Sequence, residues 1–158
     1  MADMKLSDWM TLAADATAEI ATGALGIGNV QWQHPTEVAM PGDLCGVYIP
    51  LMTEGFSVQL GVLGQREVCT HLAKSLLGMG PEESLADENE VFDAVGEVTN
   101  LVAGGVKSRA AEHTNVTLGL PLALTGTVFP LGGAAFEHGL MRMDDNDVWL
   151  VVAGAPMS

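Results

Sequence analysis

The chain has 158 residues, of which 48% are hydrophobic, and 20 acidic against 6 basic residues give it a formal net charge of -14. This length suits one domain over residues 1–158 and excludes a small fold that needs disulfides or a metal for stability. The acidity excludes a basic nucleic-acid surface and disfavours anionic membranes, and no apolar run approaches the roughly 20 residues of a membrane helix. We expect a soluble cytoplasmic protein without an export signal.

The first part of the chain predicts a helix, a loop and a β-hairpin. Residues 7–25 begin at the cap-like Ser7 and Asp8 and continue with apolar residues three and four apart, which is typical of a helix. Residues 31–43 hold two prolines and a glycine and predict an irregular loop. In residues 45–63, two apolar runs flank Thr53-Glu54-Gly55, so we expect a hairpin.

The second part predicts two more helices and then strands. Residues 65–77 have helical spacing and stop at a Gly-Met-Gly-Pro segment. An acidic connector, residues 81–90, leads into the longest periodic segment, residues 87–113. Three β-like runs follow over residues 116–128, 134–143 and 148–153, with Asp144 to Asp147 as a turn. The order of these elements predicts an α+β domain.

The sequence predicts no metal or redox centre. Cys45 and Cys69 lack the close spacing of a metal knuckle or a redox pair, and we expect both as reduced thiols. The four histidines show no ligand spacing, and the Asp144 to Asp147 segment lacks the later ligands and the glycine of a calcium loop. There is also no nucleophile elbow or phosphate-binding glycine loop.

The long predicted helix has two different faces. A projection at about 100° per residue places five valines in one sector, which we expect to face the core: Val91, Val95, Val98, Val102 and Val106. The opposite sector is polar and contains Glu90, Asp93, Glu97, Asn100, Gly104 and Lys107. A solvated polar face is the ordinary explanation of such a sector.

Two details of the polar sector favour a function. Asn100 stands in the middle of the helix, where asparagine is a poor helix former. Gly104 and Gly105 follow inside the same helix and cost about 0.8–1 kcal/mol each relative to alanine. We interpret the glycines as a place where another backbone approaches closely.

A short internal similarity links this helix to the first one. Ala18-Glu19-Ile20-Ala21-Thr22 aligns with Gly96-Glu97-Val98-Thr99-Asn100, and Gly26 then falls on Gly104. The match is short, so coincidence and an internal helix-strand duplication both remain open.

Residues 92–107 resemble the signature helix of the CheX, CheC and FliY chemotaxis phosphatases, whose mark is Glu-x-x-Asn. Gly119-Leu120-Pro121 is similar to the small-Leu-Pro strand that these proteins carry after the helix. The resemblance covers most of the chain after about residue 43. It implies a CheC-like fold, with long helices packed on a mostly antiparallel β-sheet.

The resemblance also implies an activity, which is removal of the phosphoryl group from the aspartate of a CheY-type receiver domain in bacterial chemotaxis. Asn100 would orient the attacking water, and Glu97 would pair with the receiver's lysine. Glu90, Asp93, Gly104 and Lys107 would then contact the receiver. The Mg²⁺ belongs to the receiver, so we expect no cofactor or metal on this chain.

Within this family we expect one active site and a homodimer. The first helix offers Glu19 and Thr22, and a threonine hydroxyl is too short to replace the asparagine amide. A single site favours the CheX branch. Pairing of two chains through sheet edges would cover residues 134–143, which we expect to be open. The alternative function is a non-catalytic receiver-binding or flagellar-switch adaptor.

Overall fold

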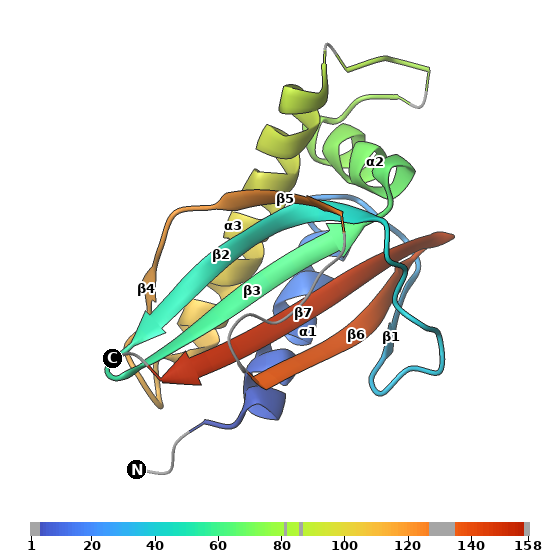
Figure 1. Cartoon of the computed structure of the whole chain (residues 1–158). Coiled ribbons are helices and arrows are strands. Elements are labelled where there is room, and N and C mark those ends of the chain that lie inside the picture. Colours follow the sequence, from blue (N-terminus) through green and yellow to red (C-terminus); the bar gives the residue numbers. More distant parts are fainter. Residues whose placement is uncertain (1–3, 81, 86, 127–134, 157–158) are drawn as a thin grey trace.

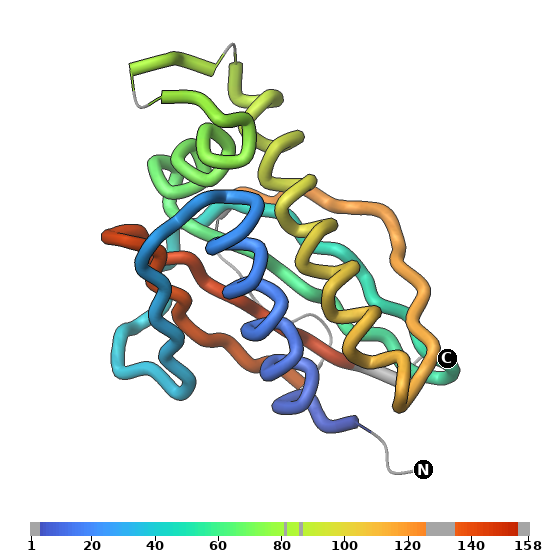
Figure 2. Tube along the Cα trace, turned by 180° about the vertical axis from the view of Figure 1, so that it is seen from behind, coloured from blue at the N-terminus to red at the C-terminus, as the bar shows by residue number. Residues whose placement is uncertain are grey.

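One antiparallel sheet carries helices on a single face (Figure 1). The computed structural model describes residues 4–80, 82–85, 87–126 and 135–156. Within these ranges, three helices are α1 (Leu6–Thr22), α2 (Arg66–Leu77) and α3 (Glu88–Ala110). Seen from behind, α1 and α3 run side by side across the sheet, and α2 lies next to the N-terminal part of α3 (Figure 2). This is the predicted α+β arrangement.

Seven strands form the sheet in the described part of the chain. Their bounds are β1 (Val30–Gln33), β2 (Leu44–Thr53), β3 (Phe56–Gly64), β4 (Thr117–Leu118), β5 (Leu122–Gly126), β6 (Ala135–Met143) and β7 (Asn146–Pro156). The strand order is β1-β6-β7-β3-β2-β4, and β5 also pairs with β2. The predicted hairpin is β2–β3, and the predicted turn at Asp144 connects β6 to β7, where Asp144 has a φ of 53°.

The helix ends follow local chemistry. The side chain of Asp87 caps α3 by accepting a hydrogen bond of 2.9 Å from the Glu90 backbone N–H. The basic residues Lys107 and Arg109 lie in its last turn, where their positive charges interact favourably with the negative end of the helix dipole. Gly78 ends α2 in the left-handed conformation with a φ of 67°, as its place after residue 77 predicts.

Three predictions about strands need correction. Residues 30–33, part of which we assigned to a loop, form β1 and pair with β6. The predicted strand 116–128 is divided into β4 and β5, because the chain leaves the sheet around Pro121; its last residues lie outside the described ranges. Residues 135–143 are not an open edge, because β6 lies between β1 and β7. The edges in the described part are β1 on one side and β4 with β5 on the other.

The strand order reveals the internal duplication. In this order the hairpin β2–β3 lies opposite the hairpin β6–β7, and β1 at one edge lies opposite β4 and β5 at the other. Reversing the order exchanges these equivalent elements and leaves the arrangement unchanged. The register of the central pair agrees. Counted from the hairpin turns, Phe56 of β3 corresponds to Asn146 of β7, so Gly61 corresponds to Val151, and these two equivalent residues pair with each other. Each half therefore contains a long helix, an edge segment and a hairpin, with α2 inserted between them. The topology supports the duplication over coincidence.

The main core lies between the sheet and the helices α1 and α3. It contains the predicted valines of α3, with Val91 only partly buried, and it includes Trp9, Leu60 and Leu150. A smaller apolar cluster covers part of the other sheet face and is formed by Leu44, Leu63, Leu140, Trp149 and Val151. Among the described residues, no helix is long and apolar enough to cross a bilayer.

The two glycines of α3 differ from each other. A Cβ atom built at Gly105 would lie 2.9 Å from the Cβ of Ala16, so this glycine allows α1 and α3 to approach closely. A Cβ at Gly104 would meet nothing within 4 Å. The predicted close approach is confirmed at Gly105. At Gly104 no described residue of this chain comes close, and the approach of a partner there stays a prediction.

Candidate functional site

The outward face of α3 carries the candidate site. Val95, Val98, Val102 and Val106 are buried in the core, with at most 1% of their surface exposed. Because these four side chains fix the rotation of the helix, the residues on the opposite side point away from the sheet. Figure 2 shows α3 lying on the outer side of the molecule beside α1.

Glu97 and Asn100 are both exposed on this face. They stand three residues apart, so their side chains are neighbours one turn apart, separated by about 4.5 Å of rise. Val98 and Thr99, which lie between them in sequence, are buried, and the Thr99 hydroxyl donates a 2.9 Å hydrogen bond to the Val95 carbonyl. The side chains of Glu97 and Asn100 form no hydrogen bond or ion pair with any residue that the structure describes. Both side chains can therefore meet an external partner.

The other predicted contact residues extend along the same helix. Asp93 and Lys107 are exposed and span about 21 Å of helix axis around the pair. Gly104 is half-buried, and the space where its side chain would be is open. Glu90 is half-buried, and its backbone N–H is engaged by the Asp87 cap. The structure thus brings Asp93, Gly104 and Lys107 to the outward surface and leaves Glu90 at its margin.

The corresponding face of α1 is occupied by internal contacts. The Glu19 carboxylate forms an ion pair with Arg109 of α3. The Thr22 hydroxyl donates hydrogen bonds to the carbonyls of Ala18 at 3.0 Å and Glu19 at 3.3 Å. Both side chains have partners within the protein, in contrast to Glu97 and Asn100, although Glu19 remains 71% exposed. The geometry therefore favours α3 as the functional helix.

No group of three or more His, Cys, Asp or Glu side chains able to hold a metal ion occurs in the described ranges. The outward face of α3 carries carboxylates, an amide and an amine without a converging ligand set. Such a face can position another molecule's reacting groups by hydrogen bonds and charge.

A family model, chemotaxis phosphatase CheX, matches residues 47–135, which is more than half of the chain and includes all of α3. The chain belongs to the CheX family. Among curated protein sequences, none matches it.

Solved structures show the same fold. CheX of Vibrio vulnificus has a TM-score of 0.75 and 14% identity, with 97% of this chain and 100% of that chain covered. CheX of Borrelia burgdorferi, solved in a complex with CheY, BeF3 and Mg²⁺, has a TM-score of 0.69 and 17% identity over 96% and 99% of the chains. FliY of Thermotoga maritima has a TM-score of 0.61 and 14% identity over 91% and 84%. The predicted CheC-like fold is confirmed.

Sequence reasoning missed one pair of neighbouring thiols in this CheX-family protein. Cys45 and Cys69 are 24 residues apart in sequence, yet their Sγ atoms lie 3.2 Å from each other. Both are free thiols, as we expected. Their proximity depends on how α2 folds back onto β2, and no spacing in the sequence signals it.

Proposed function

We propose that this protein is a phosphatase that removes the phosphoryl group from the aspartate of a CheY-type receiver domain. The observation that carries the proposal is the exposed, unpartnered pair Glu97 and Asn100 on one face of α3. Membership of the chemotaxis phosphatase family and the Borrelia CheX complex with CheY support this choice of partner.

Asn100 is proposed to orient the water that attacks the acyl phosphate. A carboxamide can accept a hydrogen bond from water and donate one as well, and it adds no negative charge next to the phosphoryl group. The side chain projects from the middle of a helix whose other face is packed, so the backbone position from which the amide extends is fixed. Positioning of this kind is the main task in phosphoryl transfer, where the protein does little covalent chemistry.

Glu97 is proposed to pair with the receiver's lysine. A carboxylate one turn from Asn100 can form a charge-assisted hydrogen bond with an amine while the amide reaches the neighbouring phosphoryl group. The pair would fix the receiver in register on α3, with Asp93, Gly104 and Lys107 as further contacts. The Mg²⁺ of the reaction is assigned to the receiver, and no step requires a metal on this chain.

We also propose that the protein forms a homodimer through a sheet edge. The edge strands are β1 on one side and, on the other, β4 and β5, which both pair with β2. These edges replace residues 135–143 as the proposed interface. At the β4–β5 edge, 85% of Leu120 and 62% of Leu122 are exposed. A second chain would cover these leucines and pair unsatisfied strand groups. Sedimentation equilibrium of the purified chain tests the proposal, and a monomer at micromolar concentration would refute it.

The phosphatase proposal is tested by the decay of a Mg²⁺-bound, acyl-phosphorylated CheY-type receiver in the presence of catalytic amounts of this protein. The wild type should accelerate the decay, and Asn100→Ala and Glu97→Ala should remove most of the acceleration. Thr22→Ala on α1 is the matched control, because it shortens a side chain at the equivalent position of the other helix, and it should retain full activity.

A wild type that binds the receiver and leaves its lifetime unchanged would refute catalysis for that receiver. It would favour the alternative function, a receiver-binding or flagellar-switch adaptor. The likeness of the fold to FliY is compatible with both functions.

A further inference from the structure

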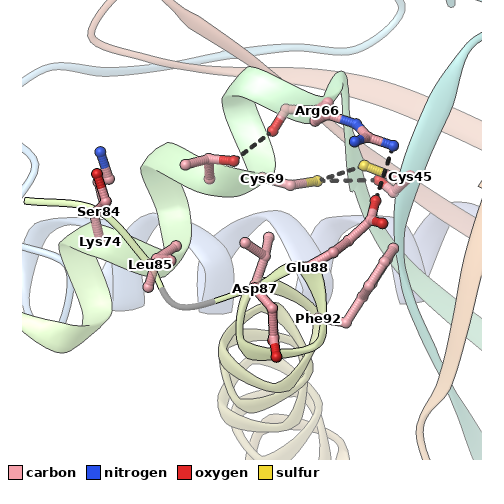
Figure 3. A pocket seen from close by; sticks show the side chains of 11 residues that line it. Cys45, Arg66, Cys69, Lys74, Ser84, Leu85, Asp87, Glu88 and Phe92 are labelled. Carbon is pink, nitrogen blue, oxygen red and sulfur yellow. Dashed lines mark hydrogen bonds and ion pairs between the residues drawn. The ribbon is translucent and has the colours of Figure 1, made fainter.

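Two thiols meet at the end of the sheet that α2 covers. Cys45 is the second residue of β2, and Cys69 lies in the first turn and a half of α2. Figure 3 shows their side chains pointing toward each other, and the distance between the two Sγ atoms is 3.2 Å. A disulfide needs about 2.05 Å, so closing the bond requires a movement of only about 1.1 Å.

The two thiols differ in accessibility. Cys45 is half-buried and lines a cavity of about 310 Å³ between α2 and the beginning of α3. The wall of this cavity includes Arg66 and Glu88, which form a 2.9 Å ion pair at its exposed rim (Figure 3). Cys69 also lines the cavity, but only 1% of its surface is exposed. A small reagent in the cavity therefore reaches Cys45 before Cys69.

The chemistry of the thiols points the same way. The Cys69 thiol contacts the carbonyl oxygens of Cys45 at 3.3 Å and Gly64 at 3.6 Å. Burial raises the pKa of Cys69 far above its ordinary value, and the neighbouring Cys45 thiol is a second, smaller cause. Because the thiolate is the nucleophile, the raised pKa makes Cys69 a poor first reactant. In the second step its Sγ already lies 3.2 Å from Cys45 Sγ, and this proximity offsets the low thiolate fraction.

We propose that Cys45 and Cys69 are a modification site that forms a reversible intramolecular disulfide by exchange with a low-molecular-weight disulfide, with Cys45 reacting first. In the first step the Cys45 sulfur attacks the small disulfide, whose S–S bond breaks. One small thiol leaves with the proton of Cys45, and a mixed disulfide remains.

In the second step the Cys69 sulfur loses its proton and attacks Cys45 Sγ. The mixed disulfide breaks, and the second small thiol leaves with that proton. Two cysteines are oxidised and one small disulfide is reduced to two thiols, so the exchange needs no other reactant.

The bond would tie the beginning of β2 to α2. It closes a loop between positions 45 and 69, and a cross-link of this length restricts the unfolded chain considerably. The oxidised protein should therefore melt about 5 °C or more above the reduced protein.

The test uses the full-length protein in buffers of reduced and oxidised glutathione. Samples are quenched with an alkylating agent over time and analysed by intact mass and by tryptic peptides. Cleavage after Lys5, Arg66 and Lys74 places Cys45 in peptide 6–66 and Cys69 in peptide 67–74. The expected course is a transient glutathione adduct on peptide 6–66, followed by a disulfide between the two peptides and a higher melting temperature.

Two variants test the order of the steps. Cys69→Ser should accumulate the glutathione adduct on Cys45, because the second step is missing. Cys45→Ser should leave Cys69 reduced, and neither variant should show the oxidant-dependent rise in melting temperature. The proposal is overturned if the wild type keeps both thiols alkylatable, stops at the mixed disulfide, or links two chains through Cys45. These outcomes are read in the wild type alone, so they do not depend on the variants folding.

Discussion

Glu19 of α1 and Arg109 of α3 form an ion pair across the contact between the two long helices. Glu19 occupies the position in the first half that Glu97 occupies in the second. A carboxylate in the same place thus contacts the neighbouring helix in one half and faces outward without a partner in the other. Under the proposed function, the copy on α1 contacts the neighbouring helix and the copy on α3 binds a partner.

The Glu19→Gln variant should keep full phosphatase activity and lose little stability. The Glu19 side chain is 71% exposed, and an ion pair with so exposed a member contributes about 1 kcal/mol or less. Receiver decay and urea unfolding of the variant measure the two effects. A strong loss of activity would show that α1 also takes part in the reaction.

The Asn100→Asp variant should lose the rate acceleration by about 10² or more. The new carboxylate is nearly the same size, but it cannot donate to water and it repels the phosphoryl group. Because the site is exposed, stability should change by no more than about 0.5 kcal/mol. Single-turnover decay of the phosphorylated receiver at saturating enzyme measures the rate. Retention of activity would mean that the amide is not needed at position 100.

The Glu97→Gln variant should mainly weaken binding of the receiver. Removing the charge takes away a charge-assisted hydrogen bond worth roughly 1.5–3 kcal/mol, which corresponds to roughly tenfold or more in KM. Steady-state kinetics separate this effect from the fall in kcat expected for position 100. An unchanged KM would exclude the proposed pairing with the receiver's lysine.

Alanine at the two glycines of α3 should have opposite effects on stability. Gly104→Ala has open space for the methyl group and should stabilise the helix by about 0.5–1 kcal/mol. Gly105→Ala places its methyl 2.9 Å from the Cβ of Ala16 and should destabilise the protein by about 1 kcal/mol or more. Urea unfolding of both variants checks the pair. Equal stabilisation would show that the helices separate without cost.

Receiver binding should become somewhat tighter as salt increases. This chain carries a formal net charge of -14, and receiver active sites are themselves acidic. Salt at about 0.1 M shortens the range of their repulsion to about 10 Å. Fluorescence titrations across an ionic-strength series measure the trend. Monotonic weakening would instead indicate that the local ion pair of Glu97 dominates.

The elements that sequence reasoning found are those with strong local patterns. The helix α3 repeats valines on one face over about four turns, and α2 ends at a glycine in the left-handed conformation, so the sequence pattern predicts both closely. Likewise, Glu97 and Asn100 share a face because of helical geometry alone. Patterns of this kind need no knowledge of distant contacts.

The missed features depend on contacts between distant residues. The strand β1 has only four residues, and its burial pattern does not alternate cleanly, because it is defined by its pairing with β6. The different environments of Gly104 and Gly105 depend on where α1 packs, and the cysteine pair depends on where α2 folds back. No periodic pattern in the sequence indicates these contacts.

The crossed strand order makes the two halves of the chain mutually dependent. The β2–β3 hairpin of the first half is extended by β4 and β5 of the second, and the β6–β7 hairpin of the second half is extended by β1 of the first. Val30 pairs with Met143, which lies 113 positions later, so β1 can join the sheet only after β6 has formed. Contacts of such long range slow folding. The sheet on which α3 packs is therefore built from both halves of the chain.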